Sequence, residues 1–157
     1  MNNLTLEERA DIITHKLKFL SKELKPSVVF LKSLSPFQEG SHKELESFCK
    51  QAGGITLNGT KEDTDVADII LMLTAPPIEK MIAEVIPFLE RGGWQKSPAV
   101  IKNKLYVVDQ ALLLDLNSGE RQMDAVEMLA EIFYPEYFNF GYEGEGWFRF
   151  EWNTENL

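Results

Sequence analysis

The sequence predicts a three-layer α/β/α domain with a mostly parallel sheet, preceded by a long helix. Short runs of β-branched and aromatic residues alternate with amphipathic stretches of helical spacing, which is typical of βαβ units covered on both faces. The chain has 157 residues, 44% of them apolar, which is enough for one hydrophobic core. It contains one cysteine, so this core must form without a disulfide within the chain.

The first predicted element is one long amphipathic helix over residues 5–24. Thr5 and Glu8 form a capping-box pattern at its start, and Pro26 ends it. Its apolar positions alternate spacings of four and three: Leu6, Ala10, Ile13, Leu17, Leu20 and Leu24. Two interpretations stay open for this stripe. It covers the domain's own core, or it forms a seam that pairs with a partner helix, although fewer than three heptads is short for such a seam.

The first βα unit follows this helix. Residues 27–31 (SVVFL) suit a buried strand, and residues 32–40 are expected to be irregular. A second capping-box pattern starts a helix over residues 41–52, and Gly53 supplies the left-handed residue that ends it. Cys49 lies on the apolar face of this helix and is interpreted as a small core residue.

Two further units complete the predicted sheet. Residues 67–73 (ADIILML) form a buried strand, and a helix over 78–85 starts after two prolines. Residues 105–109 (LYVVD) form the last strand, 110–119 a long loop, and 121–133 an amphipathic helix.

The remaining tail is rich in aromatic residues separated by glycines, so a regular helix is not expected there. It is predicted to wrap the surface and bury its rings, with stacking on a ligand or partner as the alternative. The chain is thus divided into an N-terminal helix (1–25), an α/β lobe (26–136) and an aromatic-rich tail (137–157).

The composition argues against several functions. The formal net charge is −9 and the pI about 4.8, so nucleic acid is not an expected partner. His15, His42 and Cys49 are the chain's whole histidine and cysteine content, which excludes a zinc cluster. Phosphate-binding loops and the nucleophile elbow are absent, and carboxylates such as Glu127 and Glu131 are assigned to solvated helix faces. We therefore expect no catalytic residues, no metal and no required cofactor.

The N-terminus is polar and has neither the apolar core nor the cleavage site of a secretory signal. The chain as given is therefore expected in the cytoplasm, or in the periplasm if it is a fragment of a longer precursor. Its longest apolar run, residues 69–73, is too short to cross a membrane, so no membrane span is predicted.

Open α/β sheets bind their ligands at the carboxyl ends of the strands. Three predicted loops lie there, at residues 33–41, 74–77 and 110–119. Their candidate ligand-facing residues are Phe37, Gln38, His42, Thr74, Gln110, Asp115 and Asn117. Ordinary loop polarity explains each of these residues equally well.

A series of short motifs runs through the second half of the chain. It comprises ADII at 67–70, GW at 93–94, PAV at 98–100, Asn103, Tyr106, Asp109, Arg121, LA at 129–130 and PE at 135–136. In this order the motifs resemble the C-terminal lobe of the cobalamin and ferric-siderophore ABC-transporter substrate-binding proteins. Residues 24–54 are similar to the opening of that lobe, and residues 5–24 resemble the helix that joins the two lobes.

The resemblance implies a periplasmic-binding-protein-like lobe that binds a ligand without catalysis. The ligand would be cobalamin, haem or a ferric siderophore. The implied ligand-binding residues are Phe37, Gln38, His42, Thr74 and Gln110. His42 departs from the family pattern, which usually has an aromatic residue near this point. Glu62 is the nearest counterpart of the glutamate that contacts an ABC permease, and the helix that carries it is predicted to be short.

A single lobe provides half of a cleft, so a partner is expected to complete it. The apolar seam Leu6, Ile13, Leu17 and Leu20 predicts a homodimer or a missing-lobe partner. The alternative is a cytoplasmic protein-interaction or regulatory domain, self-associating, that kept the fold and lost transport.

Overall fold

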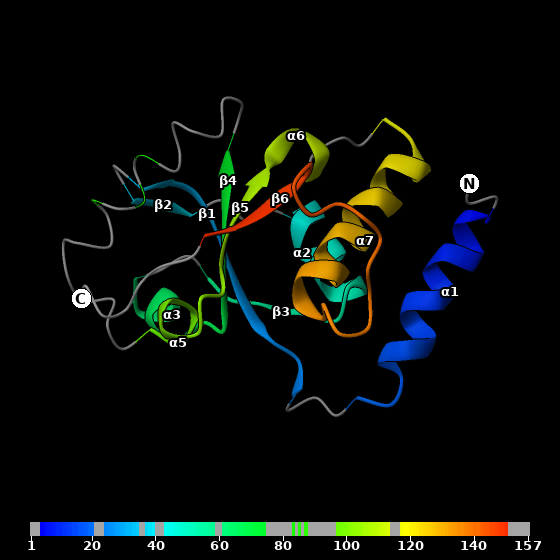
Figure 1. Ribbon diagram of the computed structural model, residues 1–157, viewed down its shortest axis with the longest axis horizontal. Helices are drawn as coiled ribbons and strands as arrows, with labels where there is room; N and C mark the ends of the chain where they lie inside the picture. The colour runs from blue at the N-terminus through cyan, green and yellow to red at the C-terminus, as the bar shows by residue number, and fades with distance from the viewer. Residues whose placement is uncertain are drawn as a thin grey trace.

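The computed structural model describes residues 4–20, 24–34, 37–39, 43–58, 61–74, 83, 85, 87, 97–113 and 117–150. The strands are β1 (Ser27–Leu34), β2 (Phe37–Glu39), β3 (Ile55–Thr56), β4 (Ile69–Thr74), β5 (Leu105–Asp109) and β6 (Trp147–Phe150). The helices are α1 (Leu6–Leu17), α2 (Lys43–Gln51), α3 (Lys61–Val66), α5 (Pro98–Ile101), α6 (Gln110–Leu113) and α7 (Gly119–Phe133). Figure 1 shows their arrangement.

Within the described residues, six strands form one sheet in the order β2-β1-β4-β5-β6, with β3 beside β1. The central strands β1, β4 and β5 are parallel, and β3 pairs with β1 in the same direction. The strands β2 and β6 are antiparallel to their neighbours and lie at the two edges. The mostly parallel sheet predicted from the sequence is therefore confirmed.

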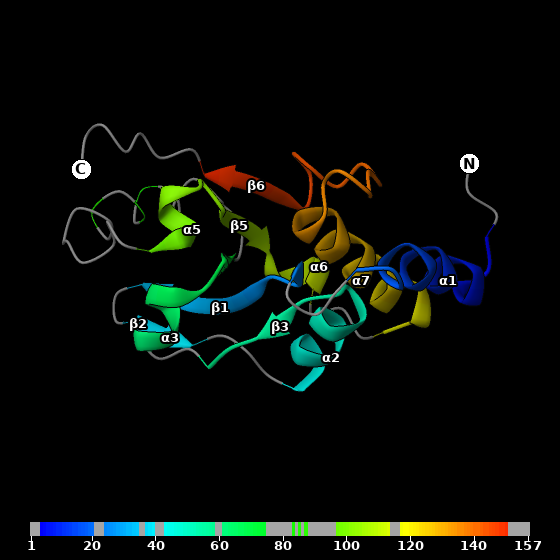
Figure 2. The same cartoon turned by 90° about the horizontal axis from the view of Figure 1, so that it is seen from below.

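The strand residues alternate between two hydrophobic clusters, one on each face of the sheet. Val28 and Phe30 belong to the cluster that α2 and α7 cover. Val29 and Leu31 point the other way, into the cluster that contains α5 residues. Figures 1 and 2 show α3 and α5 on one side of the sheet and α2 and α7 on the other. This is the predicted three-layer α/β/α architecture.

Helix α1 packs on α7 and lies outermost on that side of the molecule (Figure 2). The predicted capping box is present, since the Thr5 hydroxyl accepts from the Glu8 amide at 3.1 Å. Ile13 is fully buried, and Leu17 and Leu20 pack against the same core. Ile13, Leu17 and Leu20 of the predicted seam thus pack on the chain's own core, while Leu6 is 39% exposed.

The end of α1 differs from the prediction, because the helix stops at Leu17 instead of near residue 24. The Leu20 amide donates to the Leu17 carbonyl in a turn at 3.0 Å. The turn keeps Leu20 on the core while the chain changes direction toward β1 (Figure 1). The leucine spacing therefore predicted the packing of Leu17 and Leu20 correctly, but it was wrong for Leu24, which is 65% exposed, and for the length of the helix.

Three further segments differ from the sequence prediction. The first strand extends to Leu34 and pairs with β2, so residues 32–34 and 37–39 form an antiparallel pair where irregular chain was expected. The predicted loop after β5 begins with the short helix α6. The aromatic-rich tail contributes β6, which pairs with β5 from Leu105 to Val108. Only β6 has a partner that is distant in sequence, since β2 pairs with the end of β1 and Asp109 caps α6.

Other predicted features agree with the structure. Gly53 has φ +89 directly after α2, as a helix-ending glycine requires, and Cys49 is fully buried. Most of the predicted helix over 78–85, including its start, lies outside the described residues, although Val85 is buried. Among the described helices, none is both long and apolar enough to cross a lipid bilayer.

Candidate functional site

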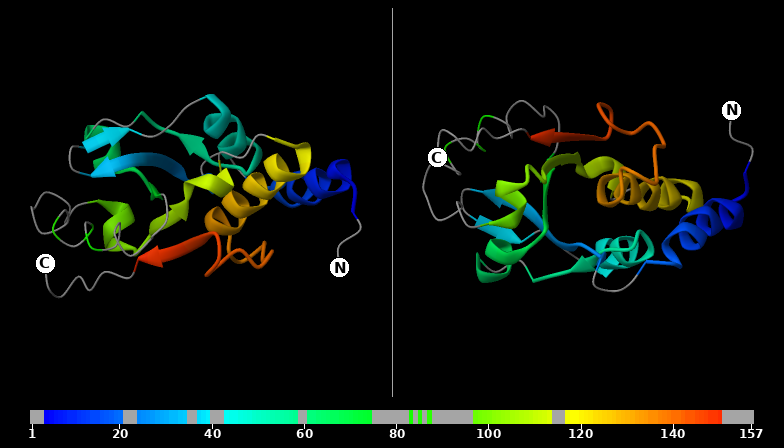
Figure 3. Two further views of the ribbon diagram at one scale, coloured as in Figure 1. Left: turned by 90° about the horizontal axis from the view of Figure 1, so that it is seen from above. Right: turned by 60° about the horizontal axis from the view of Figure 1, so that its bottom comes forward.

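The carboxyl ends of β1, β4 and β5 lie at one edge of the sheet, because these strands run parallel (Figure 3). Thr74 is the last residue of β4 and pairs with Asp109, the last residue of β5. Gln110 follows Asp109 directly and begins α6. Adjacent strands are roughly 5 Å apart. The fold therefore brings the backbones of Thr74 and Gln110 together at the predicted ligand edge.

Phe37 and Gln38 lie on β2, at the outer side of the same region. Phe37 pairs with Leu34 and Gln38 with Ser33, so β2 runs beside the end of β1, opposite β4. The side chains of Phe37, Gln38 and Thr74, and the whole of His42, lie outside the described residues. Their contact with a ligand remains a prediction.

Gln110 is held in a defined place by its neighbours. The Asp109 carboxylate accepts from the Ala111 amide at 2.9 Å and so caps α6. The Asp109 amide donates to the Gly146 carbonyl at 2.9 Å. A Cβ at Gly146 would lie 2.6 Å from the Met128 sulfur, so the glycine permits this close approach. The aromatic-rich segment therefore holds the start of α6 in place, where the half-buried Gln110 lies.

The chemistry available at this edge is hydrogen bonding. The half-buried Gln110 offers an amide donor and acceptor. Asp109, the nearby carboxylate, caps α6 as described above. Within the part of the chain that the structure describes, no three His, Cys, Asp or Glu side chains gather as a metal site. This donor set suits recognition of a polar ligand.

Glu62, the predicted permease-contacting residue, is exposed in the first turn of α3. This helix has six residues, so it is as short as the sequence indicated. An exposed carboxylate on a short helix is available to a partner. Contact with a permease remains a prediction.

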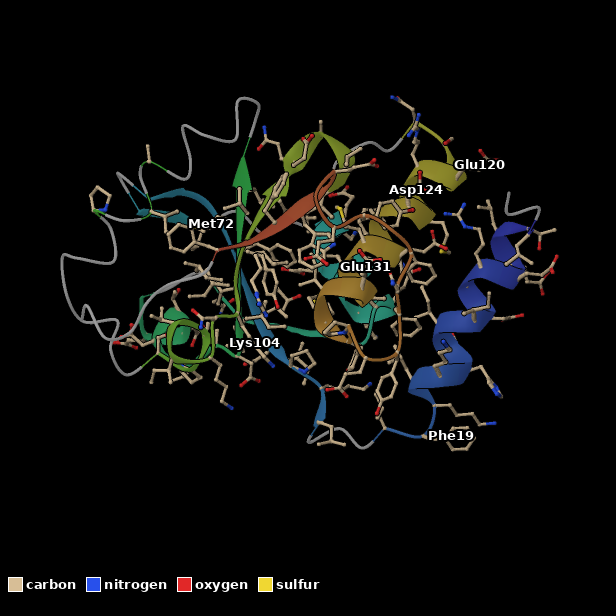
Figure 4. All side chains as sticks on the ribbon, viewed as in Figure 1. Phe19, Met72, Lys104, Glu120, Asp124 and Glu131 are labelled. Atoms are coloured by element: carbon tan, nitrogen blue, oxygen red, sulfur yellow. The ribbon has the colours of Figure 1, made fainter. Side chains whose placement is uncertain are left out.

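The sequence analysis missed a buried acidic network on α7. Glu127 and Glu131 were assigned to a solvated face, yet they are only 5% and 3% exposed. The Glu131 carboxylate accepts from the Trp147 indole N–H at 2.9 Å and from the amides of residues 140–143. Figure 4 shows Glu131 on α7 beside the loop that leads to β6. Glu131 therefore anchors the aromatic-rich segment to the helix.

Glu127 belongs to a second part of this network, which joins α1 to α7. The Arg9 guanidinium donates to Glu127 and Asp124, at 2.6 Å each for the Nη2 contacts. The Tyr142 hydroxyl donates to Glu127 at 3.0 Å and lies 3.2 Å from Asp124. Burial raises the pKa of the Tyr142 phenol, and the two carboxylates raise it further. Hydrogen bonding to Glu127 likewise raises the pKa of Arg9.

These contacts give the network a structural role. Its charged side chains bind one another and the backbone, which is how buried charges are normally accommodated. The sequence contains a signal for this burial, because the run AVEMLAEIF at residues 125–133 is apolar on more than one face of the helix. In the structure, every residue from Ala125 to Phe133 is buried. Such a helix is covered on both sides, so its carboxylates need internal partners.

Comparisons with known proteins support the fold. No protein-family model matches the chain, and no curated protein matches it. Several solved structures, in contrast, are similar to the chain. The TroA-like periplasmic binding protein FepB from Veillonella parvula has a TM-score of 0.64 and 20% identity, over 85% of this chain and 46% of FepB.

Two further solved structures are similar. An ABC-transporter substrate-binding protein from Listeria monocytogenes EGD-e has a TM-score of 0.63 and 18% identity, over 83% of this chain and 54% of that one. An ABC transporter solute-binding protein from Sulfurospirillum deleyianum DSM 6946 has a TM-score of 0.62 and 13% identity, over 96% and 46%. The chain therefore has a periplasmic-binding-protein-like fold and spans about half the length of these proteins.

Proposed function

We propose that the chain is a non-catalytic ligand-binding module, equivalent to the C-terminal lobe of an ABC-transporter substrate-binding protein. The observation that carries this proposal is the match of 83–96% of the chain to about half of three such proteins. The ligand edge at the carboxyl ends of β1, β4 and β5 is consistent with the same role.

We propose a corrinoid, haem or ferric siderophore as the ligand class, on the basis of the motif series in the sequence. At the described edge, the half-buried Gln110 provides an uncharged hydrogen-bond donor and acceptor. These groups suit the polar rim of a large chelate. Because one lobe covers one side of such a ligand, we expect weak binding until a second lobe or partner closes the other side.

Calorimetric unfolding tests the proposal, since corrinoids and haem absorb the light used by optical methods. A ligand that binds the native state alone at ten times its dissociation constant adds about 1.4 kcal/mol to the free energy of unfolding. We expect a higher midpoint with cyanocobalamin, haemin or a ferric hydroxamate. The double variant Thr74→Ala, Gln110→Ala should lose this shift, while Lys102→Ala, on an exposed residue after α5, should keep it.

The outcomes separate the two functions considered. A shift with one ligand class that the double variant abolishes supports the binding module. An unchanged midpoint with every ligand, together with a midpoint that rises with protein concentration, contradicts it and favours a self-associating domain.

A further inference from the structure

The outward face of α1 carries an exposed stripe that the fold does not use. Ile13 faces α7, and the residues on the opposite side of α1 project to solvent. This outward stripe consists of Glu8, Asp11, Ile12, His15, Lys18 and Phe19. It includes two apolar side chains, Ile12 at 36% and Phe19 at 77% exposure. Figure 4 shows Phe19 at the periphery, beyond the end of α1.

The stripe has a shallow groove beside it and an ordered aromatic ring at one end. A hollow of about 600 Å³ is lined by Asp11, Ile12, Thr14, His15, Lys16 and Lys18. The Phe19 ring makes an edge contact with the His15 ring, with centroids 6.1 Å apart. The Lys18 ammonium lies 5.8 Å from the centroid of the Phe19 ring. These contacts hold Phe19 next to the groove, where an approaching surface would bury it.

The charges of α1 are divided between its two halves. Glu7, Glu8 and Asp11 make the N-terminal half acidic, and the last turns carry His15, Lys16 and Lys18. The outward stripe is therefore complementary to itself when a second copy lies antiparallel. In that arrangement the Glu8 and Lys18 positions oppose each other, and so do Asp11 and His15, because each pair is equally distant from Ile13 along the helix.

We propose that the outward stripe of α1 is the interface of an antiparallel homodimer of this chain. A two-fold axis near Ile12 joins each acidic half to the basic half of the other copy, which makes the contact isologous. Ile12 packs near the axis, and Phe19 packs against the first turn of the partner helix. This inference is independent of the proposed ligand edge, which lies at the ends of β4 and β5 near α6, whereas α1 lies beyond α7 (Figure 1).

The size of the stripe sets the expected strength. A twelve-residue helix is about 18 Å long, so a helix pair buries less than a standard interface of roughly 1,600 Å². We therefore expect a transient dimer with a dissociation constant of about 10 μM or weaker. Charge complementarity sets the antiparallel orientation, and burial of Ile12 and Phe19 contributes the apolar part of the binding energy.

Sedimentation velocity with charge-reversed variants tests the proposal. An acidic variant carries His15→Glu, and a basic variant carries Asp11→Lys, at the position that opposes His15 in the antiparallel pair. Glu8 is left unchanged because it forms the capping box, and Lys16 because its Nζ donates to the Tyr137 carbonyl at 2.8 Å. We expect each variant alone to associate about tenfold more weakly than the wild type, and their equimolar mixture to regain association.

Two controls make the outcome specific. The variant Lys50→Gln lies at an exposed position on α2, lowers the net charge by one as His15→Glu does when His15 is neutral, and should sediment like the wild type. Phe19→Ser should weaken association without changing charge. The proposal is overturned by a wild type that remains monomeric at about 1 mM, by a mixture that stays monomeric, or by a control that dissociates as the acidic variant does.

Discussion

Glu131 is the residue on which the aromatic-rich segment depends most directly. Its carboxylate is 3% exposed and accepts hydrogen bonds from four successive amides and the Trp147 indole. These donors belong to irregular chain that has few other partners for them. A single side chain therefore provides the hydrogen-bond acceptors that strands or helices supply elsewhere.

We predict that Glu131→Ala lowers the free energy of unfolding by about 3–5 kcal/mol, because it leaves the buried Trp147 indole N–H and four part-buried amides without their acceptor. Glu131→Gln retains one oxygen and should have an intermediate effect. The exposed Glu136→Ala is the matched control and should change stability by less than about 0.5 kcal/mol. Urea unfolding measures all three, and equal effects of Glu131→Ala and Glu136→Ala would contradict the anchoring role.

Cys49 is expected to lower the free energy of unfolding as the pH rises above 9. Burial raises the pKa of its thiol from 9.0 to about 11. Above pH 9 the unfolded chain ionises its thiol while the folded chain does not, so stability is full below pH 9 and declines as pH rises toward 11. We expect a loss of about 2–3 kcal/mol over this window.

Urea unfolding between pH 7 and pH 11 measures this decline, and Cys49→Ala should flatten the part that begins near pH 9. Tyr134 and Tyr142 also have pKa values raised by burial, so a loss above pH 10 should persist in the variant. A Cys49→Ala profile identical to the wild type between pH 9 and 10 would show that the thiol does not contribute.

At the scale of elements, α1 is held to α7 by apolar contacts and by one buried ionic connection. Arg9 and Glu127 are 15% and 7% exposed at their side chains and 2.6 Å apart. Arg121 on α7 also lies near Asp124, but at 3.9 Å and 58% exposed. Arg9 thus forms a buried ion pair between α1 and α7, and Arg121 forms an exposed ion pair within α7.

We predict that Arg9→Gln destabilises the chain by about 3 kcal/mol, since it leaves the buried Glu127 without its charged partner. Arg121→Gln should cost less than about 1 kcal/mol, because exposed pairs contribute little. Thermal unfolding of both variants and a double-mutant cycle with Glu127→Gln give the comparison. Equal costs for the two arginine variants would contradict the assignment of a buried connection.

The elements that the sequence predicted correctly are those with local signals. The capping box at Thr5, the strand run at 105–109 and the helix-ending Gly53 all act within a few residues. The missed elements β2, α6 and β6 are short: β2 pairs with the adjacent end of β1, Asp109 caps α6, and β6 pairs with β5, which is distant in sequence. The error at Glu131 has a similar cause, since a helix pattern reveals one buried face and α7 has two.

The candidate site was predictable only as a location. The parallel strands define the edge, and the pairing of Thr74 with Asp109 brings the backbones of Thr74 and Gln110 near each other, while contact of either residue with a ligand stays a prediction. The support for Gln110 from Gly146 was not predictable, because it depends on the close approach of the aromatic-rich segment to α6 and α7. Periodicity carries no information about such contacts.

At the scale of the whole molecule, the two hydrophobic clusters share the same strands. Adjacent residues Leu71 and Met72 of β4 are both fully buried, but Leu71 faces α7 and Met72 faces α5. Loss of one cluster would remove one side of every central strand. We therefore expect the two faces to unfold together as one cooperative unit.

Leu71→Ala and Met72→Ala test this coupling from opposite faces. Each should lower the free energy of unfolding by about 2–5 kcal/mol and leave a single transition, because each creates a cavity beside a shared strand. Ile101→Ala, at a half-exposed position, should cost less than about 1 kcal/mol. Far-UV circular dichroism and tryptophan fluorescence should give coincident urea transitions for all variants. If Met72→Ala produced separate transitions in the two signals, the α5 side would unfold as a separate cooperative unit, and the sheet would not couple its two faces.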